Sequence, residues 1–259
     1  MGTFLFDKII FGPVKSRRLG ISLGINLLPT DSKLCNFNCI YCECGWTPGK
    51  QEIKIKFHPR ELVAEKLEEM LVKMKENNEQ LDVITYAGNG EPTLHTDFDK
   101  IIDDTIRLRD KYFPNVRIAV LSNATLIHKE SVFKALNLVE DNILKLDSAF
   151  DETVRLLNNP IGKYDTKKLV ENLKKFNGNL IIQTMFVKGF YEGKLVDNTT
   201  ENELVAWIDL LHQIKPKMVM IYTIARDTPS PDLVKVSLDD LNIIKKRLEN
   251  EGFEVQVSA

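Results

Sequence analysis

Three cysteines lie in the stretch Cys35-Asn36-Phe37-Asn38-Cys39-Ile40-Tyr41-Cys42. The spacing C-x3-C-x2-C supplies three thiolates from one loop, and a four-iron, four-sulfur cluster held by three thiolates keeps one iron open to a small molecule. The fourth cysteine, Cys44, is too close to Cys42 to be an easy fourth ligand, and the chain has no other cysteine. The loop therefore predicts a cluster with an open coordination position.

Other roles for the cysteines fit the sequence less well. Structural zinc needs four ligands, usually in two separated hooks, and this loop has neither a second hook nor a nearby histidine. An electron-transfer cluster needs four thiolates, usually with a remote fourth one, which is absent. A disulfide scaffold would spread its cysteines, so their clustering indicates metal in a reducing cytoplasm. For Cys44 the ordinary interpretation is a free, partly buried thiol, and a redox or substrate role is the alternative.

Strands and helices alternate on both sides of the cysteine loop. Short apolar runs predict strands over residues 20–28, 82–87, 117–122, 143–147, 180–187, 217–223 and 253–257. Helical periodicity predicts helices over residues 59–77, 97–112, 128–138, 165–176, 201–214 and 237–251. Asp97 and Ser237 are expected as N-caps, and Asn177-Gly178 as a C-cap. This order predicts an α/β fold in which helices cover a parallel sheet, curved or closed.

The chain is expected to form a single domain over residues 1–259, because no Gly-, Ser- or Pro-rich linker divides it. Residues 1–19 are expected to be an N-terminal extension, and the irregular stretch 188–200 an insertion. The net charge of −2 does not exclude nucleic acid, but it does not favour it. The apolar runs are much shorter than the roughly 20 residues of a membrane-spanning helix, so no membrane partner is expected.

Glycines and polar residues follow the predicted strands at their carboxyl ends, where function collects in parallel α/β barrels. The segment Gly88-Asn89-Gly90-Glu91-Pro92-Thr93 follows the strand over residues 82–87. Glycine lets backbone approach a ligand closely, although two glycines are more often simply a turn. Ser122 and Asn123 end the next strand, where the alternative role is an N-cap for the following helix.

Five further polar residues are candidate substrate or ligand contacts. Asp147 ends an apolar run and Gln183 interrupts one, so both are expected to face the lumen of a barrel, because a buried carboxylate is costly without a partner. Arg226 follows the strand over residues 217–223 and is a candidate contact for an anionic substrate. Arg17 and Arg18 precede the first strand as a basic pair, either solvated or an anion clamp.

The cysteine stretch resembles the signature of the radical S-adenosylmethionine superfamily, and the Gly88–Glu91 segment resembles its "GGE" motif. The resemblance implies a partial (β/α)6 TIM-like barrel with one [4Fe-4S] cluster on Cys35, Cys39 and Cys42. The open iron of such a cluster binds S-adenosylmethionine, and one electron cleaves it to methionine and a 5′-deoxyadenosyl radical. By this resemblance the S-adenosylmethionine contacts are Tyr41 against the adenine, Gly88, Asn89, Gly90, Glu91, Ser122, Asn123, Asp147, Gln183 and Ile224.

From Gly12-Pro13 to Arg226 the chain is similar to the wyosine-synthetase-like branch of that superfamily. The tRNA-modifying members carry extra cysteines before the signature for a second cluster, and this chain has none before Cys35. The resemblance implies hydrogen abstraction from a small-molecule or nucleotide-like substrate, with an electron from a donor such as flavodoxin or ferredoxin. The alternatives are an activase for a glycyl-radical enzyme, a tRNA-modifying wyosine-synthase-like enzyme, and a non-catalytic metal-binding protein.

Overall fold

The computed structural model describes residues 4–48 and 57–259. The chain divides into two compact units. The N-terminal unit consists of Leu5–Cys35 and Thr47–Asn142, and the C-terminal unit of Met1–Phe4, Asn36–Trp46 and Ile143–Ala259. The boundary therefore falls directly after Cys35, inside the cysteine stretch. A single domain over residues 1–259 stays a prediction.

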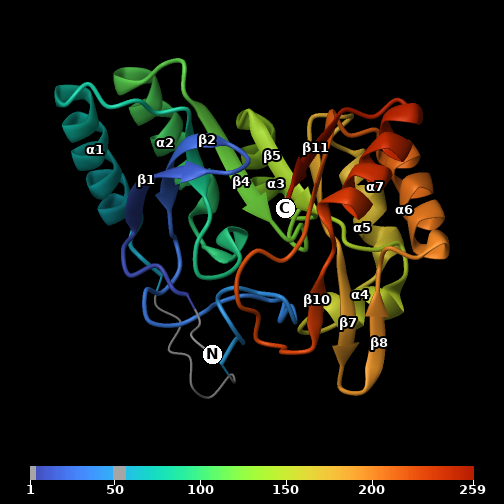
Figure 1. Cartoon of the computed structure of the whole chain (residues 1–259). Helices are drawn as coiled ribbons and strands as arrows, with labels where there is room; N and C mark the ends of the chain where they lie inside the picture. Colours follow the sequence, from blue (N-terminus) through green and yellow to red (C-terminus); the bar gives the residue numbers. More distant parts are fainter. Residues whose placement is uncertain (1–3, 49–56) are drawn as a thin grey trace. The chain divides into compact units, whose positions relative to one another are not determined.

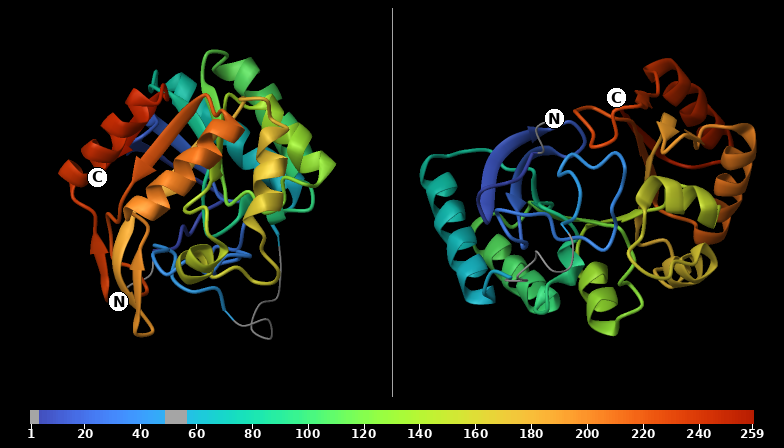
Figure 2. Two further views of the ribbon diagram at one scale, coloured as in Figure 1. Left: turned by 90° about the vertical axis from the view of Figure 1, so that its right-hand side faces the viewer. Right: turned by 90° about the horizontal axis from the view of Figure 1, so that it is seen from below.

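The N-terminal unit has four strands, and its helices lie on one side of them (Figures 1 and 2). The sheet order is β1 (Ile10–Ser16), β2 (Gly20–Ile25), β3 (Val83–Tyr86) and β4 (Arg117–Ser122). Its helices are α1 (Arg60–Glu76), α2 (Phe98–Tyr112) and α3 (Glu130–Leu138), with a 3₁₀ turn η1 (Pro92–Leu94). Strands β2, β3 and β4 are parallel as predicted, and every residue of β3 is buried, which is typical of a strand covered on both faces.

Two details of the N-terminal unit differ from expectation. The predicted N-terminal extension contains β1, which pairs antiparallel with β2; its residues 1–3 lie outside the described part of the chain. Asp97 occupies the N-cap position of α2, but its side chain does not cap the helix. It accepts a hydrogen bond from Lys100 Nζ at 2.7 Å instead, so the predicted side-chain cap is wrong.

The C-terminal unit repeats the pattern of parallel strands and covering helices. Its sheet order is β5 (Asp141–Lys145, which begins at the unit boundary), β6 (Ile181–Met185), β9 (Met218–Tyr222) and β11 (Val255–Ser258). Its helices are α4 (Asp151–Asn158), α5 (Thr166–Lys174), α6 (Glu201–Ile214) and α7 (Leu238–Asn250). Lys145, Gln183 and Met220 are register partners on neighbouring strands, so their side chains share one face of this sheet.

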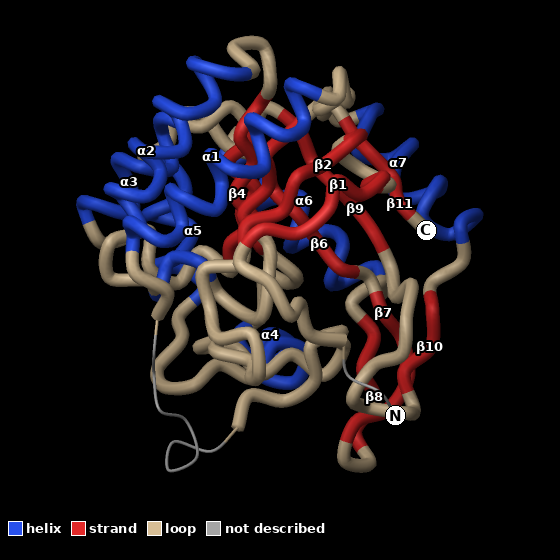
Figure 3. Tube along the Cα trace, turned by 90° about the vertical axis from the view of Figure 1, so that its left-hand side faces the viewer, coloured by secondary structure: helices blue, strands red, loops and turns tan. Residues whose placement is uncertain are grey.

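Four elements of the C-terminal unit were not predicted. Strands β7 (Val187–Tyr191), β8 (Lys194–Asp197) and β10 (Leu233–Lys235) form a separate antiparallel sheet in the order β10-β7-β8, visible at the lower right of Figure 3. The expectation of an irregular stretch over residues 188–200 is therefore wrong, since a hairpin turning at Glu192 and Gly193 occupies it. The fourth element is the short helix α4. Among the described residues, no helix is both long and apolar enough to cross a membrane.

Candidate functional site

The cysteine loop of the C-terminal unit is anchored to the end of α4. The backbone carbonyls of Leu157 and Asn158 accept hydrogen bonds from the backbone N–H groups of Ile40 (3.0 Å) and Asn38 (2.9 Å). These carbonyls belong to the last turn of the helix, where they lack partners within the helix. The helix ends there because Asn159 adopts a left-handed conformation with φ 41°. The loop residues on either side of Cys39 thus use the orphan carbonyls of α4.

Side chains reinforce this anchor at a buried polar cluster. The amide Nδ2 of Asn158 lies 3.5 Å from Cys39 Sγ, 2.6 Å from Tyr41 Oη and 2.7 Å from Asp147 Oδ2. The Tyr41 hydroxyl donates to the same Asp147 oxygen. Burial, and then the Asp147 carboxylate, raise the pKa of Tyr41 well above its ordinary value, so the phenol is neutral and remains a donor. Two residues of the cysteine stretch are therefore fixed by one carboxylate and one amide.

Asp147 has a cation as a further partner. Its Oδ1 accepts from the backbone N–H of Met185 at 2.9 Å and lies 3.5 Å from Lys145 Nζ. Lys145 also donates to the Tyr222 hydroxyl at 3.1 Å. Burial lowers the pKa of Lys145, but Asp147 and Tyr222 raise it more, so the net pKa lies above the ordinary value and the group is an ammonium. Asp147, predicted as a ligand contact, is thus held by donors of the protein itself.

In the N-terminal unit, the Gly88–Glu91 segment is joined to the residue before Cys35. Leu34 donates its N–H to the Asn89 carbonyl at 2.8 Å, and its carbonyl accepts the Glu91 N–H at 3.1 Å. Gly90 lies opposite Leu34 with φ +137°, and a Cβ there would lie 1.8 Å from the Leu34 carbonyl oxygen. Only glycine fits this approach, so Gly90 allows the segment to lie directly against the start of the cysteine stretch.

Glu91 links the ends of β3 and β4. One carboxylate oxygen accepts from the Thr93 N–H (3.1 Å) and the Ser122 hydroxyl (2.8 Å), and the other from the Asn123 N–H (2.7 Å). Burial raises the pKa of Glu91, and these hydrogen bonds only partly offset it. The Asn123 side chain in turn directs Nδ2 at Cys35 Sγ, 3.7 Å away. Four predicted site residues are therefore brought together within this unit: Glu91, Ser122, Asn123 and Cys35.

Gly88 packs closely against the side chain of Asn26. A Cβ on Gly88 would lie 2.3 Å from Asn26 Oδ1, the oxygen that accepts the Asn89 N–H at 3.1 Å. Gly88 is thus needed for close packing against Asn26.

The alternative role of Ser122 and Asn123 as an N-cap is wrong, because α3 begins only at Glu130.

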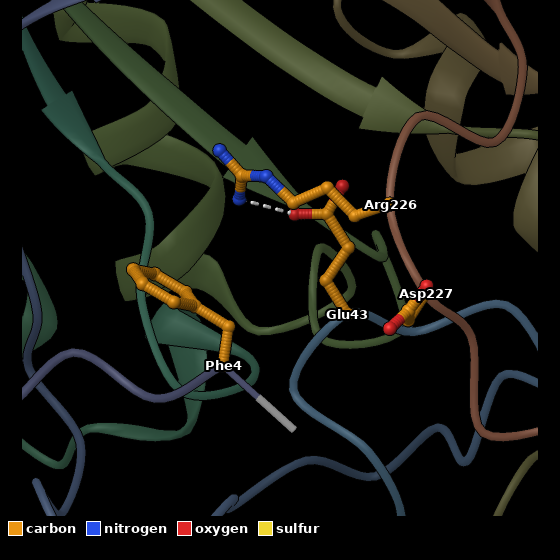
Figure 4. Close-up of a pocket in the computed structure, with 4 residues that line it drawn as sticks. All are labelled: Phe4, Glu43, Arg226 and Asp227. Atoms are coloured by element: carbon orange, nitrogen blue, oxygen red, sulfur yellow. Dashed lines mark hydrogen bonds and ion pairs between the residues drawn. The ribbon is translucent and has the colours of Figure 1, made fainter. Parts of the chain in front are cut away.

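Arg226 lies in an open pocket lined by Phe4, Glu43 and Asp227 (Figure 4). Its guanidinium donates to Glu43 at 2.7 Å and lies 5.3 Å from the centre of the Phe4 ring. Glu43 directly follows Cys42, so this ion pair holds the loop after β9 beside the end of the cysteine stretch. A substrate contact by Arg226 stays a prediction.

The remaining predicted residues are less closely associated. Gln183 is buried, and its Nε2 has no hydrogen-bond partner among the residues that the structure describes. Ile224 follows β9 and is half-buried. Arg17 and Arg18 lie in the turn before β2, whereas Cys35 comes after the carboxyl end of that strand. The structure does not bring this basic pair together with the Gly88–Glu91 segment.

Two residues of the site were missed from the sequence. Lys145 lies in the run Ile143-Leu144-Lys145-Leu146, and a charge inside an otherwise apolar strand was a signal that could have identified it. Asn158 ends the unpredicted helix α4 and carries no local signal. Its role depends on a contact with Cys39, which is 119 positions away in the sequence.

The donor chemistry of these residues fits an iron–sulfur cluster. Three thiols come from one short loop, and a side-chain amide N–H is directed at two of them, Cys35 and Cys39. Amide donors at sulfur are the kind of hydrogen bond that stabilises cluster thiolates. Within residues 4–48 and 57–259, no three Cys, His, Asp or Glu side chains are gathered as ligands of a single metal ion. The fit therefore rests on the donor set and its hydrogen bonds.

Comparison with known proteins identifies the class. The model of the Radical SAM superfamily matches residues 31–199, which include the cysteine stretch, the Gly88–Glu91 segment and the ends of β4, β5 and β6. The chain belongs to the radical SAM superfamily, whose members are enzymes that generally use S-adenosylmethionine and a [4Fe-4S] cluster.

Curated relatives cover most of the chain. UPF0026 protein MJ1312 of Methanocaldococcus jannaschii is 32% identical over 235 residues, which are 88% of this chain and 66% of that protein. A UPF0026 protein of Helicobacter pylori strain J99 is 31% identical over 259 residues, covering 96% of this chain and 76% of that protein. A Brachyspira hyodysenteriae protein named GTPase Obg is 30% identical over 258 residues. The aligned region covers 98% of this chain but only 35% of that protein.

Solved structures show the same fold. SuiB of Streptococcus suis bound to S-adenosylmethionine has a TM-score of 0.63 at 17% identity, over 91% of this chain and 50% of that one. A radical SAM methyltransferase of Sphaerobacter thermophilus has a TM-score of 0.66 at 14% identity, over 92% and 65%. TYW1 with a lysine–pyruvate adduct has a TM-score of 0.61 at 16% identity, over 90% and 74%. The predicted fold class, the partial TIM-like barrel of radical SAM enzymes, is confirmed.

Proposed function

We propose that the chain holds one [4Fe-4S] cluster through Cys35, Cys39 and Cys42 and cleaves S-adenosylmethionine reductively. The substrate class is a small or nucleotide-like molecule that loses a hydrogen atom. The observation that carries the proposal is the C-x3-C-x2-C loop whose first two thiols each face a side-chain amide. The absence of cysteines outside the stretch 35–44 supports a single cluster.

When bound and reduced, the cluster supplies one electron that breaks the S–C5′ bond of S-adenosylmethionine, giving methionine and a 5′-deoxyadenosyl radical that takes a hydrogen atom from the substrate. The chain's own residues orient the reactants and exclude water, as protein groups do in cofactor enzymes generally. The electron comes from an external one-electron donor of the flavodoxin or ferredoxin class. Asp147 and Arg226 remain proposed substrate contacts, whereas Arg17 and Arg18 lie before the amino end of β2 and are not carried into this proposal.

The Gly88–Glu91 segment is the proposed site for the methionine part of S-adenosylmethionine. It is held against Leu34 by backbone hydrogen bonds, and both of its glycines are only half-buried, so part of their backbone is accessible to a ligand. Among the described residues, nothing donates a hydrogen bond to the Gly90 carbonyl, which leaves an acceptor for an amino group. Ser122, Asn123, Gln183 and Ile224 are proposed to complete the binding site.

The adenine is proposed to lie against Tyr41. The phenol is neutral and its hydroxyl is fixed by Asp147, so the ring has one orientation next to Cys42. Asp147 thus acts on S-adenosylmethionine through Tyr41.

Anaerobic reconstitution with iron and sulfide tests the proposal. The product should contain about four iron atoms per chain, the count of one [4Fe-4S] cluster. After reduction and addition of S-adenosylmethionine, it should yield 5′-deoxyadenosine by liquid chromatography and mass spectrometry. Cys39→Ala should lose both iron and product. Cys44→Ala is the matched control and should retain both, because Cys44 lies outside the spacing. A fully loaded wild-type protein that makes no 5′-deoxyadenosine refutes the proposal, as does an active Cys39→Ala.

A further inference from the structure

We propose that Asn158 is a positioning residue that donates an N–H···S hydrogen bond to Cys39 and so raises the reduction potential of the cluster. The inference rests on the proposed function, because it requires Cys39 to be a cluster ligand. It assigns a role to the helix α4, which no motif in the sequence indicated.

The side-chain amide has its orientation fixed by its acceptors. Asn158 is 1% exposed, and its Nδ2 is within hydrogen-bond distance of Asp147, Tyr41 and Cys39. A flipped amide would place its carbonyl oxygen against a carboxylate oxygen and a sulfur, both electron-rich. The NH₂ group therefore faces Asp147, Tyr41 and Cys39.

The backbone of the same residue prevents the amide from moving away from the loop. Its carbonyl accepts the Asn38 N–H at 2.9 Å, so Asn158 holds the cysteine loop by main chain and side chain together. It is the last residue of α4, and the left-handed Asn159 follows it directly. The distance between Nδ2 and Cys39 is thus set by a helix end, which is more rigid than a free loop.

The effect on the cluster follows from charge. Reduction adds one negative charge, part of which resides on the thiolate sulfurs. A hydrogen-bond donor at sulfur stabilises the reduced state more than the oxidised state, so the potential rises. Asn123 faces Cys35 in the same way, but at 3.7 Å rather than 3.5 Å. Asn158 has the shorter contact and the more buried side chain, so we expect it to have the larger effect.

The test compares midpoint potentials of reconstituted proteins by EPR-monitored redox titration. Asn158→Leu keeps a similar volume and removes the donor. It should lower the midpoint potential of the cluster. At a fixed applied potential the ratio of reduced to oxidised cluster should then fall by about threefold to tenfold, where tenfold corresponds to 59 mV for a one-electron couple. Asn242→Leu, the same change at an exposed position of α7, should leave the midpoint unchanged.

A second variant separates tuning from simple loop support. Tyr41→Phe removes one partner of Asn158 but leaves the Asn158–Cys39 contact, so its midpoint should remain close to that of the wild type. Equal shifts in Tyr41→Phe and Asn158→Leu would show a structural effect and overturn the inference. If Asn158→Leu does not load iron, Asn158→Ser gives the same comparison, because its side chain is one bond shorter and its hydroxyl no longer reaches Cys39.

The wild-type protein offers a measurement that needs no variant. With ¹⁵N in the asparagine side-chain amides, pulsed EPR of the reduced cluster should detect two ¹⁵N hyperfine couplings, one from Asn123 and a stronger one from Asn158, and the absence of the stronger coupling would overturn the inference. An Asn158→Leu variant that holds the cluster and has the wild-type midpoint potential would also overturn the inference about Asn158. The proposed function would still stand in that case if the wild type forms 5′-deoxyadenosine. A wild type that forms no 5′-deoxyadenosine refutes the proposed function itself.

Discussion

The two units of the chain hold a cysteine in a similar way but differ in the charges around it. In each unit a side-chain amide is directed at one cysteine, and the same asparagine donates a hydrogen bond to a buried carboxylate. In the N-terminal unit, every described donor to Glu91 is neutral, and burial raises its pKa. In the C-terminal unit, the carboxylate of Asp147 also has the ammonium of Lys145 beside it.

The difference predicts how each network responds to change. A buried carboxylate with neutral donors tolerates protonation, because the loss of its charge removes a desolvation cost. A buried ion pair does not tolerate neutralisation of one partner, because the other charge is left buried without compensation. Neutralising Asp147 should therefore cost more free energy of unfolding than neutralising Glu91.

The largest effect should come from breaking the backbone contact of the N-terminal unit. Gly90→Ala places a Cβ 1.8 Å from the Leu34 carbonyl oxygen, and backbone cannot yield as a side chain can. We expect a loss of roughly 3 kcal/mol or more in the free energy of unfolding, from overpacking and backbone strain combined. Urea denaturation followed by circular dichroism measures it.

Gly162→Ala is the matched control for that prediction. Gly162 also has a positive φ, +109°, but a Cβ there would meet nothing within 4 Å. It should cost only the strain, of the order of 1–2 kcal/mol. Equal losses at both glycines would mean that the contact between Gly90 and Leu34 is unimportant.

Neutralising the carboxylate of the C-terminal unit should have the next largest effect. Asp147→Asn leaves the Lys145 ammonium buried without its counter-charge, and we expect a loss of about 3–5 kcal/mol. The double variant Asp147→Asn with Lys145→Met removes both charges and should recover part of that loss. A double variant less stable than Asp147→Asn would show that Lys145 stabilises the protein by other contacts.

Neutralising Glu91 tests the other side of the comparison. Glu91→Gln keeps an oxygen for Thr93 and Ser122 but turns an NH₂ toward the Asn123 N–H, so we expect a loss of about 1–3 kcal/mol at acidic pH. A loss larger than that of Asp147→Asn would contradict the difference inferred between the two units.

The same variant also tests the raised pKa of Glu91. The folded protein keeps a proton on Glu91 at pH values where the unfolded chain has released it, so its contribution to the free energy of unfolding falls as pH rises from the unfolded pKa through the raised folded pKa. The difference between wild type and Glu91→Gln should therefore shrink as pH rises through that window. Urea midpoints measured at a series of pH values show it, and a difference that grows with pH would contradict the raised pKa.

The sequence predicted the regular elements well where the apolar pattern was strong. The strand over residues 117–122 and the helix over residues 201–214 have the observed bounds of β4 and α6. Both have buried apolar positions at the spacing of their element, so local pattern and tertiary packing agree. The helix α4 has only eight residues and lies between two irregular segments, so its apolar pattern was too short to recognise.

The candidate site was predictable only where its chemistry is local. The three cysteines and the residues of the Gly88–Glu91 segment each lie in one short stretch, so the local motifs and their resemblance to the radical SAM signature predicted them. Asn158 and Lys145 act through partners on other elements, and no local pattern encodes such a contact. The hairpin of β7 and β8 was missed for the opposite reason, since its glycines and charges are typical of an irregular loop.

A last pair of variants removes one hydroxyl from each network, and Tyr41→Phe should have the smallest effect of all. Tyr41→Phe removes a donor to Asp147, which keeps Met185, Asn158 and Lys145, so we expect a loss of about 1 kcal/mol. Thr93→Val removes a hydroxyl donor 2.5 Å from Glu91, which has no cation beside it among the described residues. We expect this variant to lose about 1.5–3 kcal/mol in the free energy of unfolding, the range for hydrogen bonds to charged groups. Urea denaturation of both variants at pH 7 gives the order. If Tyr41→Phe costs more than Thr93→Val, the ion pair with Lys145 does not compensate Asp147 for the lost hydroxyl donor.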